Sequence, residues 1–443
     1  MSQHQLKKTL GPIMLWGLGV GYVISGMYFG WNLGLAEGGT LGLGIATLFI
    51  ITMYVCFTFC YTEMACAIPK AGGAFDYADR ALGKRWGFLA GMAQNIEFVF
   101  APPAIAFAIA AYLNHFIPGD HTLTIAIITY MIFTLVNIIG VRFAATFELV
   151  ITVIAVGELL LFCGLTLPHV ELSNLSLNAL PNGASGILAA IPFAIWFFLA
   201  IEGVANVAEE TVNPQRNIAI GFGAALATLV ALCLLVFISS VGVSGWETAV
   251  YSAGSTEAQD TPLVLVLSSV LGDGSPFVHL LVGIGIFGLV ASFHGILLAG
   301  GRATFEFGRV GYFPKAFKYI HPKLKTPVVA LVANSLVGIL ALLTGKTGEI
   351  ITMACFGAIV LYALSMVSFI QLRKQEPELE RPYRVKGGVV PAYIALVIAV
   401  VALIAMTVYN LSIAAIFFAI MLGSYALFIA FGRKSSALSA DPA

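Results

Sequence analysis

The 443-residue chain contains few charged residues. Asp, Glu, Lys and Arg make up 10% of it, whereas about a quarter is usual for a soluble domain. The 22 acidic and 22 basic residues balance, and no basic run of the kind that binds nucleic acid is present. These deficits exclude an ordinary soluble protein and predict no nucleic-acid partner.

Cysteine is also scarce. The six cysteines lie in or at the ends of apolar segments, none pairs with histidine in a metal-type spacing, and none lies in a predicted outer loop. We therefore expect reduced cysteines that pack in the interior, and no metal or other cofactor. The apolar segments also lack a recognisable nucleophile–base pair, so we do not expect an enzyme.

Long apolar runs dominate the chain instead. Hydrophobic residues make up 59% of it, and the mean hydropathy is +0.96. Runs of roughly 20 residues recur, each long enough to cross a hydrocarbon layer about 30 Å thick. They show no barrel-type alternation. We predict an all-α membrane protein with twelve transmembrane helices, at 12–36, 40–67, 87–114, 122–139, 141–167, 186–209, 217–245, 277–306, 327–344, 349–372, 390–409 and 412–432.

The basic residues predict the orientation of these helices. With the N-terminus inside, all but one of the 22 basic residues lie in cytoplasmic segments, and the exception is Lys346. Positive charge concentrates on the cytoplasmic side of membrane proteins, so we expect both termini to be cytoplasmic. The first apolar run is too long and glycine-rich for a cleavable signal. The sequence therefore predicts a multi-pass protein embedded in the bilayer of the cell inner (plasma) membrane.

Two predicted helices contain features that weaken a helix. The first carries five glycines between Trp16 and Trp31, and the sixth carries Glu202 followed by Gly203 in an apolar setting. The glycines indicate either an unwound centre or a small-residue packing face. Breaks in helices one and six occupy corresponding positions in two five-helix halves, which is typical of carriers with a site at the membrane midplane. We assign residues 1–374 to a ten-helix transport core and 375–443 to two C-terminal helices and a short tail.

Three carboxylates lie deep within predicted helices, and no Lys or Arg lies at comparable depth: Glu97, Glu158 and Glu202. A lone carboxylate at membrane depth costs several kcal/mol. Each one therefore faces a cavity, a proton path or an organic cation, or is a protonated group bonded between helices. Glu63 and Glu148 lie nearer the cytoplasmic ends, where we expect water or loop bases as their neighbours. We expect His294 to be a packing histidine.

Several segments resemble the amino acid–polyamine–organocation (APC) superfamily, in the right order and over nearly the whole chain. Ile24-Ser-Gly-Met-Tyr28 is similar to the break in that superfamily's first helix. The segments 61–83, 204–217 and 302–314 resemble its cytoplasmic connection after helix two, the end of helix six and the segment after helix eight. The resemblance implies the LeuT-like fold of two inverted five-helix repeats plus two C-terminal helices, with helices one and six broken.

Within that superfamily the chain is most similar to the ethanolamine permeases. The segments that carry this resemblance are 21–34, 92–98, 100–104, 200–206 and 292–295. It implies import of ethanolamine, a small organic ammonium, by a secondary active transporter working through alternating access. An amino acid transporter or exchanger of the same fold remains the alternative. Proton symport, facilitated uptake and exchange all remain open.

The resemblance also implies roles for individual residues. Carbonyls near Gly21 and Tyr22 match positions that accept a substrate amine, and Ser25 and Gly26 match amides that receive a carboxylate in amino acid members. Trp196 matches a gating tryptophan, Ala200 a glycine in the break, and Glu202 an acidic residue implicated in proton coupling. Ala155 occupies the register of a helix-five lysine found in some members. With the residues chosen on charge and aromatic character, the predicted substrate-binding set is Gly21, Tyr22, Ser25, Gly26, Glu97, Phe100, Trp196, Ala200 and Glu202. Glu202 and Glu158 are the candidates for proton coupling.

Overall fold

Helices make up most of the computed structural model, which describes residues 8–139, 144–272 and 274–436. The α-helices are α1 Pro12–Val23, α2 Ser25–Tyr28, α3 Trp31–Ala67, α4 Ala74–Leu82, α5 Lys84–Asn114, α6 Thr122–Ile139, α7 Ala144–Thr166, α8 Gly183–Ala189, α9 Ile191–Trp196, α10 Pro214–Ser244, α11 Pro262–Leu271, α12 Pro276–Arg309, α13 Val328–Leu342, α14 Thr347–Gln375, α15 Val390–Tyr409 and α16 Leu411–Ser436. The 3₁₀ helices are η1 Leu167–His169, η2 Leu172–Ser176, η3 Ile201–Glu210, η4 Trp246–Ala249 and η5 Lys315–Lys318.

The helices are those of a multi-pass membrane protein. In the described ranges, 10 are long and apolar enough to cross a membrane, and α1, α11 and α13 are shorter apolar helices. This confirms the predicted all-helical membrane class. The predicted limits 122–139 and 390–409 agree with α6 and α15. The first predicted helix, 12–36, is divided among α1, α2 and the start of α3. The helix α3 continues through the second predicted helix, 40–67, with a kink at Gly39, whose φ of 64° lies in the left-handed region that favours glycine.

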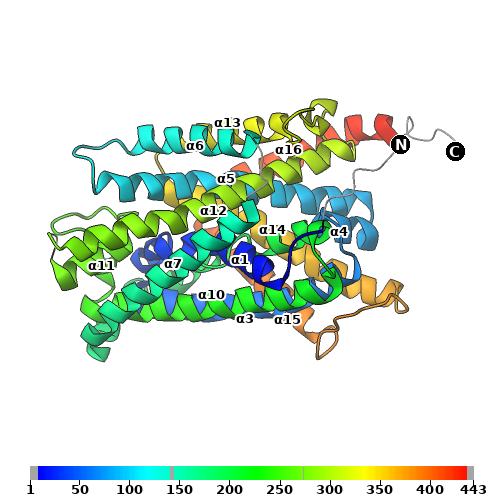
Figure 1. Ribbon diagram of the computed structural model, residues 1–443. Helices are drawn as coiled ribbons and strands as arrows, with labels where there is room; N and C mark the ends of the chain where they lie inside the picture. Colours follow the sequence, from blue (N-terminus) through cyan, green and yellow to red (C-terminus); the bar gives the residue numbers. More distant parts are fainter. Residues whose placement is uncertain (1–7, 140–143, 273, 437–443) are drawn as a thin grey trace.

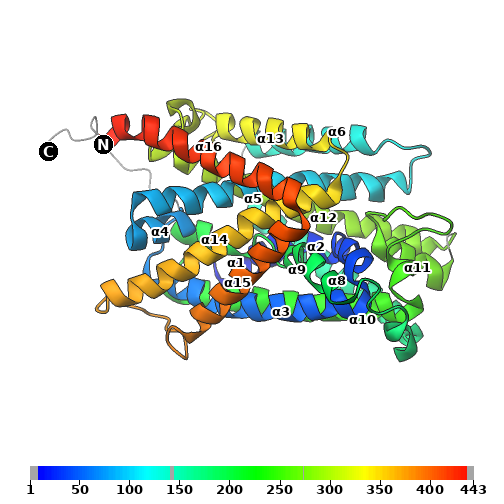
Figure 2. The same ribbon diagram turned by 180° about the vertical axis from the view of Figure 1, so that it is seen from behind.

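The helices form an elongated bundle (Figure 1). In both views α1 lies in the middle, with α5 and α12 on one side and α3 and α10 on the other (Figures 1 and 2). The short helix α9 also lies in the interior (Figure 2). The helices α4 and α11 lie at opposite ends of the bundle. The interrupted segments are therefore enclosed by long helices rather than exposed to lipid.

Glycines of α1 allow its neighbours to approach closely. A Cβ at Gly19 would lie 2.8 Å from side-chain atoms of Ala225 and Val204, and one at Gly17 would lie 2.7 Å from Leu149. This part of the glycine-rich helix is a packing face, as one of the two interpretations predicts. The unwound part lies further along the chain, after Tyr28.

Two carboxylates that the sequence placed near the cytoplasmic ends have different surroundings. Glu63 meets loop bases as expected: it accepts a hydrogen bond from Arg373 Nε (2.9 Å), pairs with Arg381 (3.2 Å) and accepts from the backbone N–H of Val385 (2.8 Å). Glu148 was expected to face water or loop bases, and this is wrong. Only 1% of Glu148 is exposed, and its partner is His294. The helix α12 crosses α7 there and covers this carboxylate, which periodicity alone does not reveal.

Candidate functional site

The first break lies between α2 and α3. Phe29 is extended (φ −162°, ψ 175°), and Gly30 has a φ of 88°, so the chain leaves the helical conformation for these two residues. Side chains satisfy the freed backbone groups: Trp196 Nε1 donates to the carbonyl of Phe29 (3.1 Å), and Asn32 Oδ1 accepts from the N–H of Gly30 (3.0 Å). Such pairing is what permits irregular backbone at membrane depth.

A second irregularity separates α1 from α2. In a regular helix the N–H of Ser25 would donate to the carbonyl of Gly21, four residues earlier. Here the N–H of Ser25 donates to Ser292 Oγ (2.9 Å), and that hydroxyl donates to the carbonyl of Gly21 (2.7 Å). The hydroxyl from α12 is thus inserted into the hydrogen-bond ladder, a recognised cause of helix bending. Two predicted site residues are thus joined through Ser292, which the family resemblance matches to a hydroxyl near the sodium site of relatives but which was not among the predicted substrate-binding residues.

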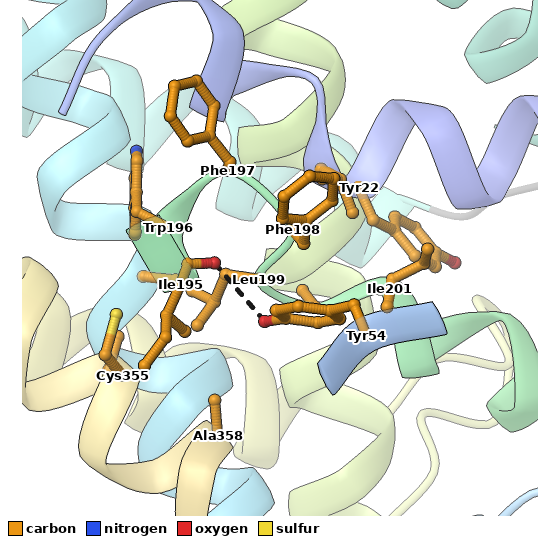
Figure 3. Packing of buried hydrophobic residues seen from close by; sticks show 14 of the residues in the cluster. Tyr22, Tyr54, Ile195, Trp196, Phe197, Phe198, Leu199, Ile201, Cys355 and Ala358 are labelled. Carbon is orange, nitrogen blue, oxygen red and sulfur yellow. Dashed lines mark hydrogen bonds between the residues drawn. The ribbon is translucent and has the colours of Figure 1, made fainter. Parts of the chain in front are cut away.

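The second break lies between α9 and η3. The chain turns through residues 197–200, as Figure 3 shows, and continues as a 3₁₀ helix. Ala200 has a φ of 73°, in the left-handed region, where a residue with a Cβ costs about 1–2 kcal/mol. Its N–H donates to Glu97 Oε1 on α5 (3.0 Å). The carboxylate of a distant helix therefore stabilises the strained end of this break.

The two breaks are in direct contact. A Cβ at Gly26 would lie 2.6 Å from the carbonyl oxygen of Trp196 and 3.1 Å from the Cα of Phe197, so only glycine fits there. The ring of Trp196 packs edge-on against Phe29 (5.4 Å between centroids). A movement of either interrupted segment must displace the other.

Glu97 and Glu202 lie together beside the second break. Both are fully buried, and their side chains lie within hydrogen-bonding reach of each other. Glu202 Oε2 accepts a hydrogen bond from the hydroxyl of Tyr362 (2.9 Å). The other oxygens, Glu97 Oε2 and Glu202 Oε1, accept no hydrogen bond from an N–H or hydroxyl group of the described residues, and no ion pair within those ranges involves either carboxylate. The pair is therefore a buried acceptor site without a basic counter-charge.

Aromatic side chains enclose this pair. Tyr54 donates to the carbonyl of Ile195 (3.3 Å; Figure 3), and its hydroxyl also lies 3.3 Å from that of Tyr362. The ring of Tyr54 packs against Phe198 (5.1 Å), and Phe57 packs against Tyr362 (4.4 Å). Sequence reasoning missed Tyr54 and Tyr362. The available signal was a phenol in the middle of an apolar helix, because its hydroxyl needs a partner when buried.

The other predicted residues lie in different surroundings. Glu158 accepts from the hydroxyl of Tyr28 (2.6 Å), which also contacts the carbonyl of Ala155, so this carboxylate has its own partner. The ring of Tyr22 covers two glycines, Gly203 and Gly295, where a Cβ would lie 2.9 and 2.5 Å from it.

Phe100 is half-buried on α5 and belongs to none of the aromatic pairs described above.

A separate buried pair joins α7 to α12. His294 Nδ1 lies 3.4 Å from Glu148 Oε2, and Glu148 Oε1 has no hydrogen-bond partner in the described chain. That free oxygen faces α1, because a Cβ at Gly21 would lie 2.5 Å from it. His294 is therefore paired with Glu148, and Glu148 places a buried carboxylate oxygen beside α1.

The geometry suits a small organic cation. The buried pair can supply one negative charge, because two carboxylates in contact do not both ionise. Phenol hydroxyls supply hydrogen bonds, and nearby aromatic faces attract an ammonium group. Among the described residues, no group of three or more His, Cys, Asp or Glu is arranged to hold a metal ion.

Comparison with known proteins agrees with a transport role. The profile of the family described as "Amino acid permease" matches residues 10–435. An uncharacterized transporter of Rhizobium meliloti is 27% identical over 98% of this chain and 90% of its own length. A methylthioribose transporter of Bacillus subtilis is 27% identical, with 87% and 85% covered. The vacuolar cationic amino acid transporter 4 of Arabidopsis thaliana is 27% identical, with 85% and 65% covered.

Proposed function

We propose that this chain, which belongs to the amino acid permease family, is a secondary active transporter that imports ethanolamine across the inner membrane by alternating access. The family and the relatives make it a multi-pass membrane transporter. The substrate, the direction of transport and the cytoplasmic position of both termini are parts of the proposal.

The carboxylate pair of Glu97 and Glu202 carries the choice of substrate. An amino acid brings its own carboxylate to balance its ammonium group, whereas ethanolamine brings a net positive charge and one hydroxyl. A desolvated site for such a cation needs a fixed negative charge that no basic residue neutralises. The two free carboxylate oxygens have this character.

The backbone of the first helix supports the same choice. An amino acid substrate of this fold would place its carboxylate on the amides at Ser25 and Gly26. The N–H of Ser25 is already bonded to Ser292 Oγ, which lowers its availability to an anion. The names of several relatives favour the alternative, an amino acid transporter or exchanger.

Coupling to a proton gradient fits the same carboxylates. Protonation of Glu202 would remove the repulsion between the two carboxylates and leave Glu97 ionised to hold the ammonium group, so that one proton and one ethanolamine are carried together. Glu158 is the second candidate, because its bond to Tyr28 ties it to the end of α2. We propose proton symport through one of these two groups.

Ethanolamine binding to three purified variants tests the proposal. Glu97→Gln and Glu202→Gln each keep an oxygen that accepts the existing hydrogen bond, from Ala200 and Tyr362 respectively, while removing the charge. We expect affinity to fall about 30-fold or more in at least one of them, because removing one partner of a buried charge pair costs about 2–5 kcal/mol. Glu171→Gln, at an exposed carboxylate outside the site, is the control and should bind normally.

Uptake into proteoliposomes separates the remaining alternatives. A pH gradient, acidic outside, should accelerate accumulation of labelled ethanolamine, and Glu202→Gln or Glu158→Gln should abolish that acceleration. Unchanged binding in both Glu97→Gln and Glu202→Gln would contradict the assigned site. Strong competition by amino acids, with weak ethanolamine binding, would instead establish the alternative function.

A further inference from the structure

A groove on the outer surface of the bundle lies apart from the substrate site. It has a volume of about 420 Å³ and is bounded by the start of α5, the middle of α14 and the middle of α16. The helix α16 packs against both α5 and α14, as Figure 2 also shows. All of its lining residues are apolar or aromatic except one, and they include Trp86, Val360, Phe418, Met421 and Tyr425.

The exception is Arg85, the second residue of α5. It is exposed, and no hydrogen bond or ion pair to its side chain occurs in the described parts of the chain. The distribution of basic residues predicts that this end of α5 faces the cytoplasm. Arg85 is therefore an unneutralised positive charge at the point where the groove meets the cytoplasmic surface of the membrane.

The rest of the groove suits the hydrocarbon part of a lipid. Trp86 is 48% exposed, and together with Tyr425 it has the amphipathic character of residues found at the membrane–water interface. Phe418 lies seven residues before Tyr425, which places it about 10 Å deeper along the helix. The groove thus leads from a basic group at the surface towards an apolar interior.

We propose that this groove binds one anionic phospholipid of the cytoplasmic leaflet, with its phosphate on Arg85 and an acyl chain along α16. Basic pockets between transmembrane helices on the cytoplasmic side bind such headgroups. A second copy of the chain is a weaker candidate, because residues 411–436 contain no Asp or Glu that could neutralise Arg85 across a symmetric α16 contact. The site does not depend on the transported substrate.

Fluorescence quenching in vesicles tests the assignment. The full chain is reconstituted in phosphatidylcholine containing increasing fractions of brominated phosphatidylglycerol or, in parallel, brominated phosphatidylcholine. The signal from Trp86 is the difference between the wild-type protein and Trp86→Phe. We expect the anionic lipid to quench it at a lower mole fraction than the neutral lipid.

Two charge variants distinguish a site from general attraction to the membrane. Arg85→Gln should weaken the preference for the anionic lipid about fivefold, the contribution expected of one basic residue. Lys84→Gln, an exposed neighbour that does not line the groove, should leave the preference unchanged. Equal quenching by the two lipids, or equal effects of the two variants, would overturn the proposal. Quenching that disappears as the protein self-associates would overturn it too, in favour of a second copy in the groove.

Discussion

Replacement of Ser292 by alanine should damage the first helix more than the loss of one hydroxyl suggests. The hydroxyl is fully buried and serves two backbone groups, the N–H of Ser25 and the carbonyl of Gly21. A buried backbone group left without its partner costs about 1–3 kcal/mol. If both stay apart in Ser292→Ala, the loss in the free energy of unfolding is about 2–6 kcal/mol.

A second outcome sets the lower limit. The carbonyl of Gly21 and the N–H of Ser25 are four residues apart, the separation of an ordinary α-helical hydrogen bond. In the variant, α1 and α2 can therefore join into one helix in which these two groups bond to each other. The stability loss then falls to about 1 kcal/mol, the net value of a typical hydrogen bond. Closure would turn Tyr22 and the second half of the helix away from their present contacts. We therefore expect weaker ethanolamine binding in either case.

Ser368→Ala is the matched control. Ser368 is also fully buried on a transmembrane helix, but its hydroxyl only adds a bond to the carbonyl of Leu364 within α14. Both variants are compared by their free energy of unfolding in mixed micelles and by ethanolamine affinity. Equal stability losses, with affinity unchanged in Ser292→Ala, would refute the role of the inserted hydroxyl.

Two further predictions concern pH and packing. Removal from water raises the pKa of Asp260, in the loop before α11, to about 6, although the hydroxyl of Thr347 donates to it (2.7 Å). This is above the ordinary value of about 4, so the stability that this group contributes is complete at acid pH and lost as the pH rises through 6. The unfolding midpoint should accordingly fall between about pH 4 and 6 in the wild-type protein and change less in Asp260→Asn; identical profiles would contradict the assignment. Gly357→Ala should lower both the unfolding midpoint and the affinity for ethanolamine, because the added Cβ would lie 2.7 Å from the backbone nitrogen of Glu97. The control is Gly423→Ala, which has open space around it and should be neutral or slightly stabilising. A neutral Gly357→Ala would show that α5 and α14 separate easily.

The sequence located the helices much better than it located their breaks. Apolar length predicts the ends of α6 and α15, because crossing the membrane requires a minimum run of apolar residues. The glycine-rich segment offers several equivalent places for an interruption. The structure uses Phe29 and Gly30 for it, where side chains from other helices satisfy the backbone.

The second break shows what a single sequence leaves out. The sequence predicts the break from Glu202 and Gly203. In the structure, however, the helix ends at Trp196 and the left-handed residue is Ala200. Intrinsic preferences disfavour alanine there, and only the resemblance to a family pointed to it. The bond from Glu97, about a hundred residues earlier in the chain, stabilises it. The partners of Glu202 and Glu148 likewise depend on which helices become neighbours.

The bond between Ala200 and Glu97 gives one carboxylate two tasks. As long as its Oε1 accepts the backbone N–H, a residue in an unfavourable conformation is kept in place. Any cation that attracts this carboxylate competes with that N–H for the same lone pairs. Occupancy of the site would then change the force on the backbone at the junction of α9 and η3 directly, without a relay of side chains. In this way the binding of a small ligand could change the conformation of a whole helix.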